Sequence, residues 1–257
     1  MKIGFFDSGL GGVVVMNSVI ELLPQYDYEF YGDTANLPYG QKSEEEIFLL
    51  TKRGVEHLFS ADCILVVIAC NTASAETLRR LQDEWLPITY PDRKILGVII
   101  PMVEEVILSG VREAILIATT RTIASQKYER EFSKFTVAPN LHSIATPELA
   151  PLIEAGKIET AIELTNLIVG KEVREGSALI LGCTHYALLK PALLNQFGTE
   201  TKIFSPTEII PYKLAVYLTR HDEIEIQLSR GGTQNVYLTN EREDYLPLIT
   251  FLKTNAV

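Results

Sequence analysis

Short apolar runs alternate with longer segments of helical periodicity along most of the chain. The runs at 64–69 and 178–181 are continuously apolar and rich in large aliphatic residues, which is typical of strands buried on both faces of a sheet. Strands that alternate with helices predict parallel sheets covered by helices on both faces, an α/β fold. The predicted strands are residues 2–6, 28–32, 63–69, 94–98, 114–118, 141–144, 178–181, 201–204 and 235–238.

The order of these elements predicts two lobes related by a pseudo-twofold axis. Residues 1–97 with 207–257 form the first lobe, which carries Asp7 and Cys70, and residues 98–206 form the second, which carries Cys183 and His185. Because open α/β sheets bind ligands at the carboxyl ends of their strands, we expect the site in the cleft between the lobes. The predicted helices are residues 13–23, 43–59, 73–85, 103–109, 125–135, 158–169, 188–197, 207–218 and 244–253.

Composition and charge exclude several classes of protein. The formal net charge is −10 and the pI is about 5.0, which argues against a nucleic-acid partner, since that would need a basic face. No apolar stretch approaches the roughly 20 residues of a membrane span, and the first residues run into a strand rather than a signal peptide. Three cysteines without CxxC spacing favour reduced thiols in a cytoplasmic protein over a disulfide framework or a structural metal site.

Two cysteines occupy nearly matching positions in the two predicted lobes. Cys70 and Cys183 each follow a buried strand and precede small polar residues and a helix. A helix N-terminus lowers the pKa of a thiol, and His185 lies close enough to Cys183 to hold its proton. The matched pair therefore predicts one proton donor and one proton acceptor on opposite faces of a substrate carbon. Cys63 has no such neighbours and is predicted to be core.

Other polar segments also follow predicted strands. The glycine-rich turn after Asp7 fails the dinucleotide pattern, and its carboxylate disfavours phosphate; Asp7 with Ser8 suits a substrate ammonium or caps the turn. The loop at 32–40 offers the hydroxyl of Tyr39, but by itself it is an ordinary loop. The segment 119–125 either binds substrate or caps a helix, and Glu154 by itself indicates a solvated charge.

Taken in order, these motifs resemble the glutamate racemase family. The match rests on DSGxGG at 7–12, PYG at 38–40, CNTAS at 70–74 and GCTHY at 182–186, and it extends from about residue 3 to 204. The resemblance implies flavodoxin-like lobes and a cofactor-independent racemase, without a metal, that makes D-glutamate for peptidoglycan. It also implies that Cys70 is assisted by Asp7, and Cys183 by Glu154 and His185. Substrate-binding residues implied by the resemblance are Asp7, Ser8, Pro38, Tyr39, Gly40, Asn71, Thr72, Thr119, Thr122, Thr184 and His185.

The chain departs from the family pattern at several positions. Arg121 stands where a small residue is usual, so it either points to solvent or changes which substrate carboxylate fits. Ala118 replaces a usual glycine and Ala187 a usual proline, and the segment 238–240 lacks the usual glycine-aspartate ending.

Several alternatives to a glutamate racemase stay open. They are a racemase of the same superfamily for aspartate or another amino acid, a catalytically silent amino-acid-binding paralogue, and a Cys–His hydrolase. The hydrolase would leave Cys70 without a role. A homodimer is a further expectation, although no segment of the sequence identifies an interface.

Overall fold

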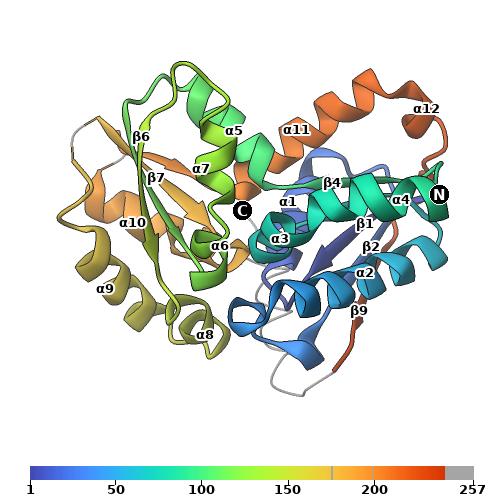
Figure 1. The fold of residues 1–257 in the computed structure, drawn as a ribbon, viewed down its shortest axis with the longest axis horizontal. Helices are drawn as coiled ribbons and strands as arrows, with labels where there is room; N and C mark the ends of the chain where they lie inside the picture. Colours follow the sequence, from blue (N-terminus) through green and yellow to red (C-terminus); the bar gives the residue numbers. More distant parts are fainter. Residues whose placement is uncertain (175, 199, 241–257) are drawn as a thin grey trace.

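Two parallel sheets form the framework of the molecule (Figure 1). The computed structural model describes residues 1–174, 176–198 and 200–240. The first sheet has the strand order β4-β3-β1-β2-β9 and the second the order β6-β5-β7-β8. The strands are β1 (Lys2–Asp7), β2 (Tyr28–Gly32), β3 (Cys63–Ile68), β4 (Lys94–Gly97), β5 (Glu113–Ala118), β6 (Asn140–Ala145), β7 (Ser177–Gly182), β8 (Lys202–Phe204) and β9 (Gln234–Leu238).

The two sheets share one topology. In each, the first four strands along the chain stand in the order second-first-third-fourth, which is the flavodoxin-like arrangement. Cys70 follows β3 and Cys183 follows β7, so each is placed after the third strand of its sheet. Every strand pair in the described residues is parallel, and the carboxyl ends of neighbouring strands therefore lie at one edge of each sheet.

Helices cover both faces of each sheet because all the inner strands are apolar. On the first sheet, α1 and α11 pack on one face, and α2 and α3 on the other. On the second sheet, α8, α9 and α10 cover one face, and α5 and α7 the other. We call each sheet with these helices the first half and the second half of the molecule.

The helical segments have the following bounds. The α-helices are α1 (Gly12–Leu22), α2 (Glu44–Ser60), α3 (Asn71–Arg80), α4 (Leu86–Thr89), α5 (Ile99–Leu108), α6 (Thr120–Ala124), α7 (Lys127–Phe132), α8 (Leu149–Glu154), α9 (Ile158–Val169), α10 (Lys190–Phe197), α11 (Pro206–Arg220) and α12 (Asp222–Glu225). A π-helix, η3 (Leu81–Trp85), joins α3 to α4. Short 3-10 helices are η1 (Thr34–Asn36), η2 (Tyr39–Gln41) and η4 (Thr184–Leu189).

The predicted strands are confirmed, with ends that differ by at most one residue. The helix predicted at 103–109 begins earlier, at Ile99, because Pro101 lies in the first turn, where its missing N–H is not needed. The helix predicted at 125–135 is observed as the shorter α7, which begins after Gln126 in its left-handed conformation (φ 50°), and the short helix α6 before it was not predicted. The helix predicted at 244–253 lies outside the described residues.

The two halves meet at the carboxyl edges of their sheets. Short helix α6 of the second half packs against η2 and α3 of the first half, and α1 packs against η4 (Figure 1). The division of the chain into lobes at 97/98 and 206/207 stays a prediction. The contact between the two carboxyl edges brings together the segments that follow β1, β3, β5 and β7.

Candidate active site

The carboxyl ends of β1 and β7 face each other across the junction of the halves. Asp7 ends β1, and the Thr184 hydroxyl, from the segment after β7, donates a 3.3 Å hydrogen bond to its Oδ2. The Asp7 Oδ1 accepts a 2.8 Å bond from the Gly9 backbone N–H, so this carboxylate also caps the turn. A Cβ at Gly11 would lie 2.4 Å from the Thr184 Oγ1, which is why the turn needs a glycine there.

Cys70 caps α3 and is held as a neutral thiol. Its Sγ accepts a hydrogen bond from the Ala73 N–H at 3.5 Å and lies 3.2 Å from the Ser8 Oγ. Burial, and then the nearby Asp7 carboxylate, raise the pKa of the Cys70 thiol to about 12. The lowered pKa expected from the helix N-terminus is therefore wrong for Cys70, because burial outweighs the backbone N–H. Near neutral pH this residue is a proton donor.

Cys183 has a different set of partners. Its Sγ lies 3.6 Å from the His185 Nδ1, and the His185 Nε2 lies 3.0 Å from the Glu154 Oε1. Burial opposes protonation of His185, but the contacts with Cys183 and Glu154 outweigh it and raise its pKa well above the usual value. His185 therefore bridges the Cys183 thiol and the Glu154 carboxylate, and places a titratable ring beside the Cys183 sulfur. This chain of three residues thus provides a candidate proton acceptor.

The interpretation of Glu154 as a solvated charge is wrong. Its side chain is only 25% exposed and ends α8, where it meets the buried His185. The sequence pattern missed this helix, although Pro151 lies in the first turn of α8, as Pro101 does in α5. The contact with His185 is compatible with the assisting role that the resemblance implies for Glu154, and that role stays a prediction.

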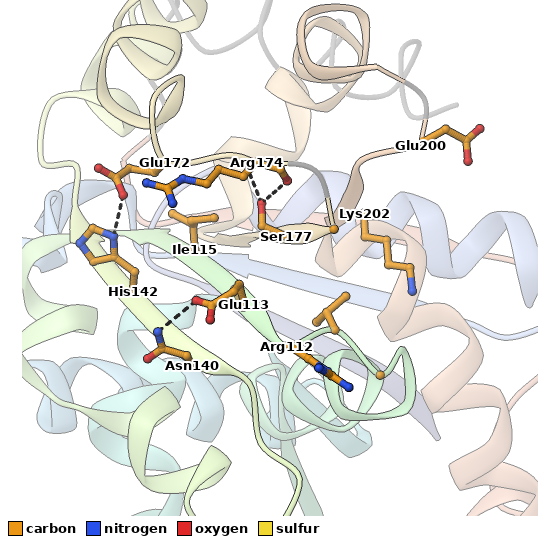
Figure 2. Close-up of a pocket in the computed structure, with 14 residues that line it drawn as sticks. Arg112, Glu113, Ile115, Asn140, His142, Glu172, Arg174, Ser177, Glu200 and Lys202 are labelled. Carbon is orange, nitrogen blue, oxygen red and sulfur yellow. Dashed lines mark hydrogen bonds and ion pairs between the residues drawn. The ribbon is translucent and has the colours of Figure 1, made fainter.

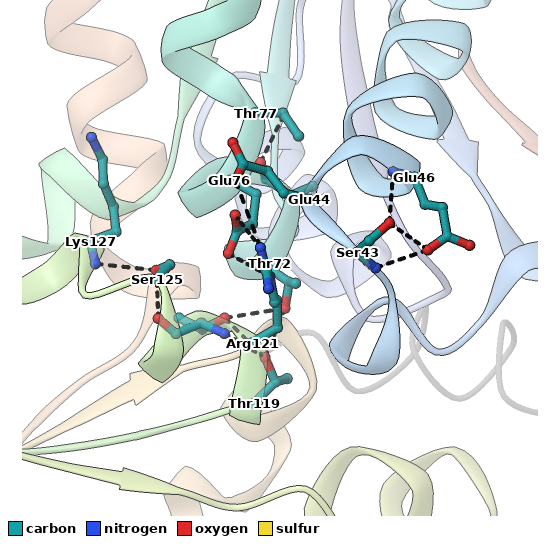
Figure 3. A network of polar contacts seen from close by, with 12 residues as sticks. Ser43, Glu44, Glu46, Thr72, Glu76, Thr77, Thr119, Arg121, Ser125 and Lys127 are labelled. Atoms are coloured by element: carbon teal, nitrogen blue, oxygen red, sulfur yellow. Dashed lines mark hydrogen bonds and ion pairs between the residues drawn. The ribbon is translucent and has the colours of Figure 1, made fainter.

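Three threonine hydroxyls from both halves form a cluster beside Cys70. The Thr72 Oγ1 of α3 lies 2.9 Å from the Thr119 Oγ1 and 3.1 Å from the Thr122 Oγ1 (Figure 3). Thr119, and not Thr122 or Ser125, is the N-cap of α6, since its Oγ1 accepts from the Thr122 N–H. The three hydroxyls together offer donors at the cleft for a carboxylate.

Asn71 adds an oriented amide next to this cluster of hydroxyls on α3. Its Oδ1 accepts a 2.8 Å hydrogen bond from the Tyr128 hydroxyl, which comes from α7 of the second half. Its Nδ2 is buried without a hydrogen-bond partner among the described residues. Because Tyr128 occupies the oxygen, the amide N–H groups remain for a ligand carboxylate. No sequence signal pointed to Tyr128, which resembles any core aromatic of an amphipathic helix.

The loop at 38–40 contributes backbone rather than a free hydroxyl. The Tyr39 hydroxyl, offered to a ligand in the sequence analysis, donates a 2.7 Å bond to the Asp33 Oδ2 instead. Asn36 and Thr239 also donate to the Asp33 carboxylate and fix the loop. A Cβ at Gly40 would meet the Thr119 Cβ at 3.5 Å, so the loop lies directly beside α6. The sequence analysis did not identify Asp33 as the residue that holds this loop.

Arg121 points neither to solvent nor to an open substrate site. Its guanidinium makes an ion pair with Glu76 of α3, with 2.8 Å between the Arg121 Nε and the Glu76 Oε1 (Figure 3). Ala118 ends β5 with 0% exposure and packs against Gly182, where an added Cβ would lie 2.9 Å from that of Ala118. The departure from the family pattern at Arg121 therefore affects a contact between the two halves of the molecule.

A cavity of about 860 Å³ opens at the other end of the second sheet (Figure 2). Its lining includes Arg112 and Lys202 near the amino ends of β5 and β8. Its polar side chains mostly contact one another, as in the 3.0 Å bond from the Asn140 amide to the Glu113 carboxylate. It lies at the strand edge opposite the cysteines and shares no residue with their site. Across residues 1–174, 176–198 and 200–240, no set of three or more His, Cys, Asp or Glu side chains is placed to hold a metal ion.

The fold and the site define a racemase. The sequence pattern of the family described as Asp/Glu/Hydantoin racemase matches residues 15–210. The chain belongs to this family. It is therefore an enzyme of the isomerase class, and the family predicted from the motifs is confirmed.

Within the family, the relatives with high similarity are glutamate racemases. A glutamate racemase of Ruegeria pomeroyi is 34% identical over 253 residues, which cover 93% of this chain and 91% of the relative. The crystal structure of a Francisella tularensis glutamate racemase in complex with D-glutamate superposes with a TM-score of 0.83 at 25% identity, covering 99% of this chain and 94% of that one. A glutamate racemase isoform of Bacillus anthracis gives a TM-score of 0.82 at 29% identity, covering 96% and 91%.

Proposed function

We propose that this enzyme interconverts L- and D-glutamate by proton transfer between the substrate α-carbon and two thiols. The observation that carries the proposal is the pair Cys70 and Cys183, which follow equivalent strands and have different partners, Ser8 beside Cys70 and the His185–Glu154 pair beside Cys183. In this scheme the Cys183 thiolate removes the α-proton and the Cys70 thiol delivers a proton to the other face. Glutamate as substrate is supported by the relatives, including the one whose structure holds D-glutamate.

The chemical difficulty lies in the weak acidity of the α-proton. Positioned proton-transfer groups contribute about 10²–10⁴-fold to the rate. The remaining acceleration must come from donors aimed at the substrate carboxylate, where negative charge develops, in a site that excludes water. The buried thiols, 6% and 7% exposed, and the oriented Asn71 amide supply such surroundings.

Individual roles follow from the donors and acceptors at the site. Asp7 and Ser8 are proposed to hold the substrate ammonium, since they offer a carboxylate and a hydroxyl beside Cys70. His185 is proposed to exchange a proton with Cys183, and Glu154 to hold His185 in place, as their contacts indicate. The substrate carboxylates are proposed to bind the amide, the hydroxyls and the loop backbone of Pro38, Tyr39, Gly40, Asn71, Thr72, Thr119, Thr122 and Thr184.

The test is to incubate the purified protein with each enantiomer of glutamate and of aspartate in D₂O. We expect inversion of optical rotation and uptake of one α-deuterium with glutamate only. Inversion of aspartate alone would replace glutamate by aspartate as the substrate. Absence of exchange with all four compounds would contradict the proposal and favour an amino-acid-binding paralogue.

We further propose that the enzyme works in the cytoplasm and supplies D-glutamate for peptidoglycan. No helix in the described part of the chain is long and apolar enough to cross a membrane. Depletion of the protein in its host should then arrest growth unless D-glutamate is supplied. A homodimer also stays a prediction, and light scattering from the purified protein would test it.

A further inference from the structure

Arg121 and Glu76 form an ion pair across the junction of the two halves. Arg121 belongs to α6 of the second half and Glu76 to α3 of the first (Figure 3). The contact is two-pronged: the Arg121 Nε lies 2.8 Å from the Glu76 Oε1, and the Arg121 Nη2 donates a 3.0 Å hydrogen bond to the Glu76 Oε2. Glu44, which is 62% exposed, adds a weaker contact 4.0 Å from the same Nη2.

The carboxylate of this pair is buried while the halves are in contact. The Glu76 side chain is 6% exposed and the Arg121 side chain 29%. Among the described residues, Arg121 is the cation that contacts Glu76. A buried charge that loses its partner is strongly destabilising, whereas the same charge in water costs little. Without Arg121, separation of the halves would therefore relieve the carboxylate by exposing it to water.

The pair lies on the same two segments as the hydroxyl cluster. Glu76 is one turn beyond Thr72 on α3, and Arg121 stands between Thr119 and Thr122 at the start of α6. The thiols that these segments help to enclose are 6% and 7% exposed, so the contact between the halves restricts access to them. Breaking or forming the ion pair is thus part of every opening and closing of the site.

We propose that Arg121 and Glu76 form a latch that holds the two halves closed over the two cysteines and sets how often the site opens. Arg121 is a positioning residue in this role, because its guanidinium is committed to Glu76 rather than to a ligand. A guanidinium suits the role, since its planar fork matches a carboxylate at two points. The consequence for catalysis rests on the proposed function, whereas the closure itself does not.

Thiol alkylation measures opening without any substrate. The protein is treated with iodoacetamide under native conditions, and mass spectrometry follows the modification of each cysteine. Cys63, 0% exposed in the core of the first half, reports global unfolding. The variant Arg121→Met removes the latch. The matched control is Arg80→Met, which breaks an ion pair with Glu45 that lies wholly within the first half.

We expect Arg121→Met to speed alkylation of Cys70 and Cys183 relative to Cys63 by about tenfold, the effect of about 1.4 kcal/mol. Both rates should rise by the same factor, because the two thiols share one opening. Arg80→Met should leave both rates unchanged. High salt should speed the same two thiols in the unmodified protein, since it screens the partly exposed pair.

Two results would overturn the latch. One is an unchanged ratio of site-thiol to Cys63 rates in both Arg121→Met and high salt. The other is an additive effect when Glu76→Gln is combined with Arg121→Met. The latch predicts that the double variant opens the site no more than either change alone, because the two residues act as one contact. The racemisation assay separates the two proposals. If the unmodified protein racemises none of the four compounds, the proposed function is wrong, but the alkylation rates still test the latch.

If the enzyme turns over glutamate, loss of the latch also changes its steady-state constants. Arg121→Met should raise KM by about tenfold through the smaller closed population, with a smaller change in kcat. Arg80→Met should leave KM and kcat as they are. A fall in kcat at constant KM in Arg121→Met would assign Arg121 to the chemical step and contradict its role as a latch.

Discussion

Cys70 and Cys183 hold the same topological position in two matching sheets but have opposite electrostatic surroundings. Around Cys70 stand a buried carboxylate and a hydroxyl, and its pKa is raised to about 12 by burial and by Asp7. Around Cys183 stands an imidazole whose own pKa is raised by Cys183 and Glu154 against the effect of burial. The repeated topology thus supplies two equivalent positions, and the side chains beside them give the two thiols different partners.

This difference is constrained by the thermodynamics of racemisation. The two enantiomers of an amino acid have equal free energy in water, so the equilibrium constant between them is unity. Consequently kcat/KM must be equal in the two directions for every variant. The asymmetry between the two thiols can therefore appear only in kcat and KM taken separately.

The largest expected effect comes from removing either thiol. Cys70→Ser and Cys183→Ser should each reduce racemisation by about 10²–10⁴-fold or more, because a serine hydroxyl is a far weaker acid than a thiol and is not ionised near neutral pH. The measurement is circular dichroism of the substrate over time. Circular dichroism of the protein itself serves as the control for folding. Substantial turnover in one variant would show that the two thiols are not equal partners.

Removing the imidazole should have the next largest effect. We expect His185→Asn to lower kcat/KM by about 100-fold with either enantiomer, since Cys183 loses the imidazole that contacts its sulfur and could exchange a proton with it. The separate values of kcat and KM should change differently for L- and D-glutamate. Initial rates from both enantiomers provide the measurement. Identical changes in kcat for the two would mean that His185 serves both thiols equally.

A smaller effect is expected from the residue that orients Asn71. Tyr128→Phe removes the hydrogen bond to the Asn71 Oδ1, and an unsatisfied buried acceptor costs about 1–3 kcal/mol. KM should therefore rise by roughly tenfold or more while kcat changes less. Tyr39→Phe is the matched control, because its hydroxyl contacts Asp33 rather than a donor of the site. A larger rise in KM from Tyr39→Phe would reverse this ranking.

The smallest expected effect is on stability as a function of pH. The folded-state pKa of His185 is raised above its unfolded value near 6.5, so its stabilisation is fully present below that pH and is lost as the pH rises through the folded pKa. Glu154→Gln removes one of the contacts that raise the pKa of His185, so the stabilisation should be smaller and its loss should be complete at a lower pH. Melting temperatures across the pH range would detect this, at about 2–4 °C per kcal/mol for a chain of this size. Parallel curves for the variant and the unmodified protein would contradict the role of Glu154.

Much of the fold was predictable because buried strands can be recognised in the sequence as apolar runs. The runs before Cys70 and Cys183 identified β3 and β7 within one residue, and parallel pairing then placed both thiols at the edge where ligands bind. The partners of these thiols were less accessible to prediction. The pattern around Glu154 describes an exposed charge, and only the packing of α8 beside His185 makes it part of the site.

Long-range contacts explain the other differences. Tyr128 and Asn71 are 57 residues apart, and the Arg121–Glu76 contact spans 45, so no local pattern links either pair. The prediction of a lowered pKa for Cys70 was wrong for a similar reason. The sequence shows a helix N-terminus, which lowers a thiol pKa, but it does not show the complete burial and the nearby carboxylate that raise it.

The return of the chain to the first sheet has a consequence for biosynthesis. Strands β5 to β8 of the second sheet are complete once Phe204 has been made, whereas the first sheet still lacks α11 and β9 at that stage. The apolar face of α11, with Ile210, Leu214 and Leu218, is the cover for α1. During translation all the strands of the second sheet are therefore made before the first sheet is complete, and the apolar face of α1 has no cover until α11 has been synthesised.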